Sequence, residues 1–181
     1  MQIYLLRHGE SEANVAGIIN DDPARDVALT LLGRAQAEVA ARRLADVPFT
    51  HAYVSQLLRA RQTAEIVQAG RLPAVVDARL NERHTGLDGR PVETFNCLVR
   101  PDPVRIRPAG GESFLEEMER VRGFLDEIAA RHPGALVLAV SHENPILAAT
   151  ALAGRDPEDA AGGGLGNCEW VVLEWPGRRV Q

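Results

Sequence analysis

The pair Arg7-His8, followed by Gly9, combines three residue types that suit phosphate chemistry. The guanidinium of Arg7 keeps its positive charge at any physiological pH and matches the geometry of phosphate oxygens. The imidazole of His8 can attack a phosphoryl group or shuttle a proton near neutral pH. Gly9 lets the backbone come close to a bound group. On its own the pair is a weak motif, because a strand followed by a solvated polar turn would have the same sequence.

Polar residues of the same kind follow other predicted strands. They are Ser55, Arg59, Glu82, Ser141 and His142. In an open α/β sheet, ligands bind outside the carboxyl ends of the strands, and parallel strands place these ends at one edge. Any one of these residues, taken alone, is more often simply the start of a loop. Taken together, they predict a cleft in which two histidines, two arginines and one carboxyl group surround an anion.

Strands that alternate with helices must position these residues. Apolar runs predict strands at residues 1–6, 51–54, 74–76, 135–140 and 170–175. Helical spacing of apolar residues predicts helices over residues 30–48, 58–68, 113–132 and 144–154, with shorter ones near 11–16 and 92–99. This alternation predicts an α/β fold, a three-layer α-β-α sandwich around a largely parallel central sheet.

Capping residues mark where two of these helices begin. Ser113 and Glu116 form a capping box, which makes the helix that starts there the clearest in the chain. Asn144 is predicted to be the N-cap of the next helix, with Pro145 in its first turn. Residues 79–111 are irregular and long for a connection. We interpret residues 83–112 as a lid-like insertion over the strand ends, within a single domain spanning 1–181.

The composition limits the kind of partner. The chain has 181 residues, of which 45% are hydrophobic and 25% charged, as in ordinary globular proteins. The sequence has no apolar run of membrane-spanning length and no basic, apolar signal segment before the first strand, so we expect a cytoplasmic protein without a membrane partner. The net charge of -5 argues against nucleic acid as a partner.

Residue types also narrow the chemistry. All 20 Lys+Arg residues are arginine, which excludes a lysine Schiff base and the lysine of a phosphate-binding P-loop. The segment His142-Glu143 begins like a zinc H-E-x-x-H motif, but Ile146 stands at the second ligand position. Cys97 and Cys168 fit no metal or disulfide pattern. We therefore expect no metal and no cofactor.

Several short blocks of the sequence resemble the histidine phosphatase superfamily, which includes the phosphoglycerate mutases. The blocks are Leu6–Glu10 with Asn14, Leu29–Ala37, Ser55–Ala64, Leu80–Glu82, Gly110–Ser113 and Ser141–His142. Each block is weak, but the ordered set over residues 5–152 is very specific. The resemblance implies a phosphoglycerate mutase-like fold and, in the phosphatase branch, a metal-independent phosphomonoesterase that hydrolyses a small phosphorylated metabolite through a phosphohistidine.

The resemblance also implies roles for individual residues. His8 is the nucleophile and Glu82 the proton donor. The phosphate is held by Arg7, Asn14, Arg59 and His142. Glu143 departs from the pattern, because many members have Gly there and the backbone N–H meets the phosphate. The N–H of Glu143 is still available, but its carboxylate must point away from the substrate or pair with an arginine.

Two other functions are weighed against the phosphatase. A phosphoglycerate mutase is the first alternative, and the segment 81–86 resembles that branch. Thr85, however, stands where mutases have Tyr. A mutase must also keep water away from its phosphohistidine, and residues 83–112 are a small segment for a lid with that task. Five arginines in this segment could bind a substrate carboxylate or face solvent: Arg83, Arg90, Arg100, Arg105 and Arg107.

The second alternative is a non-catalytic domain that binds a phosphorylated ligand. Such a domain would be marked by the loss of His8, Arg59 or Glu82, and all three are present. The partner expected on either reading is a small phosphorylated molecule. The oligomeric state, monomer or homodimer, stays open at this point.

Overall fold

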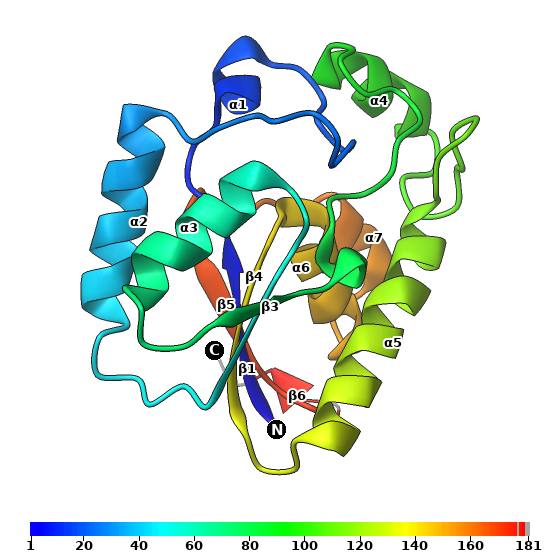
Figure 1. Ribbon diagram of the computed structural model, residues 1–181. Coiled ribbons are helices and arrows are strands. Elements are labelled where there is room, and N and C mark those ends of the chain that lie inside the picture. The colour runs from blue at the N-terminus through cyan, green and yellow to red at the C-terminus, as the bar shows by residue number, and fades with distance from the viewer. Residues whose placement is uncertain (177, 180–181) are drawn as a thin grey trace.

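A mixed β-sheet forms the centre of the computed structural model, which describes residues 1–176 and 178–179 (Figure 1). The sheet has six strands in the order β3-β2-β4-β1-β5-β6. The strands are β1 (Gln2–Arg7), β2 (His51–Val54), β3 (Ala74–Val76), β4 (Leu136–Ser141), β5 (Trp170–Glu174) and β6 (Arg178–Arg179). The first four in this order are mutually parallel, whereas β5 and β6 pair antiparallel. The expected largely parallel sheet is therefore confirmed.

Helices cover both faces of the sheet. They are α1 (Glu12–Ala16), α2 (Leu31–Arg43), α3 (Leu58–Gln68), η1 (Ala78–Leu80), α4 (Val92–Val99), α5 (Phe114–Arg131), α6 (Glu143–Leu152) and α7 (Pro157–Ala161). Helices α2 and α3 pack together on one face, and α5, α6 and α7 on the other. The three-layer sandwich predicted from the alternating pattern is the observed architecture. No helix in the described part of the chain is long and apolar enough to cross a membrane.

The alternation of side chains along each strand explains the two cores. In β1, Ile3 and Leu5 face the α5–α6 side, and Leu6 faces the α2–α3 side. In β4, Ala139 and Val140 divide in the same way. Both strands are buried on both faces, as expected for the centre of a sheet between two helical layers. Arg7, which is partly exposed, therefore marks the point where a largely buried strand reaches the surface.

Of the two helix caps predicted from the sequence, one is confirmed and one is wrong. Ser113 accepts the N–H of Glu116 and the Glu116 carboxylate accepts the N–H of Ser113, so the predicted capping box is present. The N-cap of α6, however, is His142 and not Asn144. Asn144 lies in the first turn of α6, and its side chain is thereby free for another contact. Helix α7 was not predicted, although Asp156 caps it and Pro157 opens it.

The carboxyl ends of the parallel strands meet at one edge of the sheet. The register pairs Arg7 with Ser141, and the end of β2 lies on the other side of β4. In Figure 1 this edge is at the top, where α1 and α4 lie above it. An isolated β-bridge joins Ile18 to Pro91, and Ile19 packs with Phe95 of α4. Segments distant in the sequence are thus held together above the strand ends.

Candidate active site

His8 follows the last residue of β1 and is 2% exposed. Its Nδ1 lies 2.6 Å from the carbonyl oxygen of Gly9. A carbonyl can only accept a hydrogen bond, so Nδ1 carries the proton and Nε2 presents its lone pair. Burial, and then the guanidinium of Arg59, hold the pKa of His8 well below its usual value. The ring is therefore neutral at physiological pH, with a basic nitrogen available.

Arg59 occupies the first turn of α3 and is nearly completely buried. Its Nε donates to Nε2 of His8 at 3.0 Å. The two terminal nitrogens donate to Asn20, one to Oδ1 at 2.5 Å and the other to the backbone oxygen at 2.9 Å. Burial lowers the pKa of Arg59 to about 10, which still leaves the group charged at neutral pH. Arg59 thus places a fixed positive charge against the lone pair of His8.

His142 is fully buried beside His8, with the two ring centroids 5.0 Å apart. Its Nε2 lies 2.6 Å from Oγ of Ser55. If the hydroxyl donates this bond, the proton of the neutral imidazole is on Nδ1. Nδ1 is buried and has no hydrogen-bond partner within the described residues. Burial, followed by the charge of Arg59, keeps the pKa of His142 well below its usual value.

Arg7, at the end of β1, and Glu143, at the start of α6, form an ion pair. One terminal nitrogen of Arg7 lies 3.1 Å from Oε2 of Glu143 and also donates to the carbonyl of Leu165. The other carboxylate oxygen of Glu143 accepts the N–H of Leu165 at 3.0 Å. Of the two orientations expected for this carboxylate, the structure has the one paired with an arginine. The Nε of Arg7 is buried without a partner among the described residues.

Glu82 follows η1 and turns its carboxyl group toward the strand ends. Oε1 accepts the N–H of Arg83 at 2.9 Å and the side-chain amide of Asn144 at 3.2 Å. Burial raises the pKa of Glu82, and these two donors together with the charge of Arg59 offset part of that rise. The carboxyl group therefore keeps its proton to a higher pH than an ordinary glutamic acid.

Asn14 stands at the third position of the short helix α1 and is exposed. Its Oδ1 accepts from both the N–H and the hydroxyl of Ser11, each at 3.0 Å. The oxygen of the amide is therefore used in the helix cap. Its Nδ2 makes no hydrogen bond within the part of the chain that the structure describes, and this N–H group is the one left for a ligand.

These residues converge on one pocket of about 410 Å³. Six of the seven site residues predicted from the sequence line it: Arg7, His8, Asn14, Arg59, Glu82 and Glu143. The seventh, His142, is not part of the lining but touches the site from its buried position beside His8. The size is within the range of pockets that hold small-molecule ligands.

Three residues that contact the site were not predicted as part of it. Asn20 holds Arg59, Asn144 holds Glu82, and Asn167 donates its amide to the backbone oxygen of His8 at 3.0 Å. The only local signal for Asn144 is its position two residues after His142, and an Asn before a Pro at that position predicts a helix cap instead. Asn20 and Asn167 lie in loops whose sequence carries no mark of the contact.

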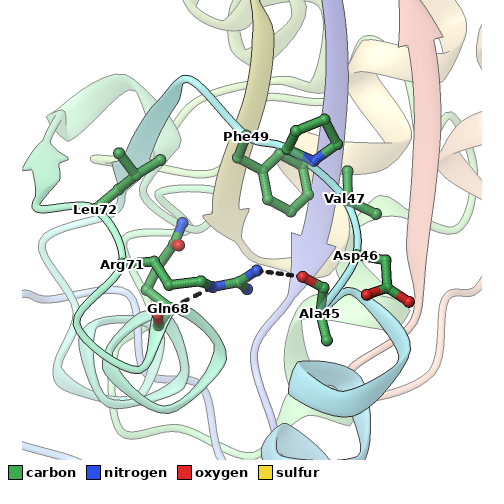
Figure 2. Close-up of a pocket in the computed structure, with 8 residues that line it drawn as sticks. Ala45, Asp46, Val47, Phe49, Gln68, Arg71 and Leu72 are labelled. Atoms are coloured by element: carbon green, nitrogen blue, oxygen red, sulfur yellow. Dashed lines mark hydrogen bonds between the residues drawn. The ribbon is translucent and has the colours of Figure 1, made fainter.

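A second pocket, of about 320 Å³, lies at the opposite end of the strands (Figure 2). It is formed by the segments that precede β2 and β3, and it includes Gln68 and Arg71. Arg71 donates to the backbone oxygens of Ala45 and Gln68, as the dashed lines in Figure 2 mark. No histidine or cysteine lines this pocket, whereas His8 lines the pocket at the other end of the sheet.

Acidic and sulfur-containing groups are not clustered for a metal. Among residues 1–176 and 178–179, no group of three or more His, Cys, Asp or Glu side chains is placed to hold a metal ion. The groups assembled around His8 are instead two guanidinium ions, a second imidazole and a carboxyl group. This combination is suited to binding an anion with three or more oxygens and to moving one proton.

Comparison with known proteins agrees with this chemistry. A sequence model of the Histidine phosphatase superfamily (branch 1) matches residues 3–181. The chain is 37% identical over 151 residues to a Proteus mirabilis protein named Probable phosphoglycerate mutase GpmB, covering 78% of this chain and 69% of that one. It is 32% identical over 190 residues to Phosphoserine phosphatase 1 of Hydrogenobacter thermophilus, covering 99% and 89%.

Solved structures show the same relationship. The mycobacterial glucosyl-3-phosphoglycerate phosphatase in complex with VO3 superimposes with a TM-score of 0.84 and 29% sequence identity, over 96% of this chain and 92% of that one. The relatives thus include both phosphatases and a protein named as a mutase. The sheet, the pocket at its carboxyl edge and the match over residues 3–181 lead to one conclusion: the chain belongs to branch 1 of the histidine phosphatase superfamily.

Proposed function

We propose that this protein is a metal-independent phosphomonoesterase that hydrolyses a small phosphorylated metabolite through a phosphohistidine at His8. The observation that carries the proposal is the neutral ring of His8, whose Nε2 lone pair faces Arg59 in a pocket that Arg7 also lines. A phosphoryl group in transfer spreads negative charge over its equatorial oxygens. Two fixed guanidinium charges beside a neutral imidazole are suited to that distribution of charge.

The phosphate is assigned to donors that the protein itself leaves without partners. The Nε of Arg7 is buried and lacks a hydrogen-bond acceptor within the described residues, and so does Nδ1 of His142, which carries the ring proton when Ser55 donates to Nε2. An unpaired buried donor costs about 1–3 kcal/mol, so such groups are rare unless a ligand satisfies them. The Nδ2 of Asn14 and the N–H of Glu143, at the start of α6, are further donors.

The first chemical step is the attack of His8 on phosphorus. Nε2 forms a bond to phosphorus as the bond from phosphorus to the ester oxygen breaks, and Glu82 gives its proton to that oxygen. Because Arg59 donates to this lone pair in the free protein, the phosphate must first take over the Nε–H of Arg59. The hydrogen bond from Nδ1 to Gly9 then stabilises the positive charge that develops on the ring.

The second step releases phosphate. Glu82, now a carboxylate, takes a proton from water, and the water oxygen attacks phosphorus and displaces Nε2 of His8. Phosphate leaves and both groups return to their starting state. Asn144 donates to Glu82 in the structure and is assigned the role of holding the carboxyl group in place during this exchange of protons.

Phosphoglycerate mutase is the second candidate, favoured by the identity to the Proteus mirabilis relative of that name. A mutase must hold the carboxylate of its substrate. Arg83 is 2% exposed and donates to the backbone oxygens of Pro103, Ile106 and Glu112. Thr85, which replaces the mutase Tyr, uses both its N–H and its hydroxyl on Asp21. These contacts support hydrolysis over mutase activity.

The decisive assay separates hydrolysis from isomerisation. The protein would be incubated with p-nitrophenyl phosphate, with an alkyl phosphate, and with 3-phosphoglycerate primed by bisphosphoglycerate. We expect phosphate release from the first two, and in the third reaction phosphate release that equals or exceeds formation of 2-phosphoglycerate. Isomer formation much faster than phosphate release would replace the proposal with a mutase.

Activity is expected to survive chelators, because arginines supply the positive charge in this mechanism. Turnover of p-nitrophenyl phosphate in excess EDTA should equal turnover in buffer. Vanadate, which can adopt the geometry of a pentacoordinate phosphoryl group, should inhibit competitively. Loss of activity with EDTA that a divalent ion restores would contradict the metal-independent mechanism.

A further inference from the structure

Part of the lining of the active-site pocket is apolar. This apolar wall is made by Ile18 and Ile19 from the segment after α1, by Val92, Phe95 and Val99 from α4, and by Leu147 from α6; Asn96 of α4 lines the pocket as well. Residues 92, 95 and 99 recur at steps of three and four, so they lie on one face of α4. Ile19, Phe95 and Val99 pack in one hydrophobic cluster. The pocket therefore places apolar side chains beside the groups assigned to the phosphate.

Most charged side chains of α4 and of the segments beside it do not line the active-site pocket. Glu93 and Arg100 form an ion pair at 3.0 Å, and both are exposed and absent from the pocket lining. Arg105 pairs with Asp102, and Arg107 with Glu116, outside the pocket as well. Arg90 is exposed and does not line the pocket. Four of the five arginines that could have bound a substrate carboxylate therefore lie away from the site.

Arg83 is the fifth, and it does line the pocket. Its guanidinium is buried against three backbone oxygens and stacks over the rings of Phe95 and Phe114. Burial lowers the pKa of Arg83, and the charges of Glu117 and Glu112 offset part of that fall. The carboxylate of Glu143, which is paired with Arg7, lines the same pocket. A carboxylate on the leaving group would lie near this negative charge, while the arginines of the pocket are engaged by phosphate, by Glu143 or by backbone oxygens.

We infer that the substrate is a phosphate monoester whose leaving group is uncharged and carries an aromatic or aliphatic part that packs against Val92, Phe95 and Ile19. This inference rests on the proposed phosphatase activity and names the substrate class of the same site. Phosphates whose leaving group carries a carboxylate, phosphoglycerates among them, are then poor substrates. The pocket of about 410 Å³ has room for a phosphate and a group of about one ring.

A matched set of substrates tests the inference. The set is 2-phenylethyl phosphate, its 4-carboxy derivative and ethyl phosphate, which all release a primary alcohol of similar acidity. We expect kcat/KM for 2-phenylethyl phosphate to exceed that for the carboxy derivative by about tenfold or more, because the site would bury the carboxylate unpaired. Ethyl phosphate makes no contact with the apolar wall, so its kcat/KM should also be about tenfold lower than that of 2-phenylethyl phosphate.

Two variants on α4 locate the effect. Val92 lines the pocket and is 40% exposed, whereas Leu98 does not line it and is 45% exposed, so both positions tolerate a long side chain. Val92→Arg should raise kcat/KM for the carboxy derivative several-fold and lower it for 2-phenylethyl phosphate. Leu98→Arg should leave both values unchanged. This control separates a charge in the pocket from a general change in the charge of α4.

Each possible outcome bears on the inference. If the carboxy derivative is hydrolysed as fast as 2-phenylethyl phosphate, or if Val92→Arg and Leu98→Arg change the ratio alike, the inference is wrong. Hydrolysis of p-nitrophenyl phosphate in the same preparation would show that the phosphatase proposal survives that result. If neither p-nitrophenyl phosphate nor any of the three esters is hydrolysed, the inference and the proposed function are overturned together.

Discussion

His8→Ala is expected to abolish turnover of every phosphate ester while leaving the fold intact. The nucleophile is lost, and loss of a nucleophile that acts with its neighbours lowers kcat by about 10⁴-fold or more. The ring sits at the end of β1 and is not part of either main core cluster, so the sheet should still form. Steady-state assays with p-nitrophenyl phosphate, together with circular dichroism and a thermal melt, measure the two effects separately.

His51→Ala is the matched control for this variant. His51 opens β2 at the opposite end of the sheet and stacks on His132. Its loss should leave kcat within about twofold of the unchanged protein, since a surface substitution far from the pocket shifts energies by only about 0.5 kcal/mol. A folded His8→Ala protein that keeps the activity of the His51→Ala protein would rule out His8 as the nucleophile.

Glu82→Gln is expected to damage the hydrolysis of alkyl phosphates far more than that of p-nitrophenyl phosphate. An alkoxide cannot leave without a proton, whereas nitrophenolate can, so the loss in kcat/KM should be about 10²–10⁴-fold for the first and about tenfold or less for the second. The missing base should also slow the second step. A stopped-flow burst of nitrophenolate, equal to the concentration of sites, should therefore precede slow turnover.

Glu143→Gln provides the comparison, because Glu143 is the other carboxyl group in the pocket and pairs with Arg7. Loosening Arg7 affects phosphate binding, which both substrates share. Glu143→Gln should therefore lower kcat/KM for both substrates by the same factor. Equal damage to both substrates in Glu82→Gln would mean that Glu82 does not protonate the leaving group.

The pH dependence follows from the pKa directions of the two groups. Burial lowers the pKa of His8, so the nucleophile becomes active as pH rises through this lowered value. Burial raises the pKa of Glu82, so the proton donor is lost as pH rises through that raised value. With an alkyl phosphate, the fall in kcat/KM on the alkaline side should disappear in Glu82→Gln, and the rise on the acid side should stay.

Much of the fold was predictable because its signals are local. Helix α3 and strand β2 have the bounds that periodicity predicts, and the capping box at Ser113 begins α5 as expected. The convergence of His8, Arg59 and Glu82 was also predictable, since the carboxyl ends of parallel strands share an edge. These predictions needed only the alternation of strands and helices along the chain.

The residues that the sequence did not reveal depend on contacts between distant segments. Asn20 reaches Arg59 across 39 positions, and Asn167 reaches His8 across 159. Nothing in the loops around them marks these contacts. Asn144 was missed for a different reason: an Asn before a Pro is typical of a helix cap, and this signal hid its contact with Glu82. Which of the five arginines between residues 83 and 107 line the pocket likewise depends on tertiary contacts.

Trapping the phosphoenzyme tests the central claim most directly. The Glu82→Gln protein would be mixed with ³²P-labelled p-nitrophenyl phosphate, quenched within milliseconds, and the labelled protein exposed to acid and to base. We predict up to one phosphate per site, labile in acid and stable in base, mapped to His8 by mass spectrometry and absent from the double variant with His8→Ala. Nitrophenolate released in a full burst without any protein-bound phosphate, or a label on another residue, would contradict this account.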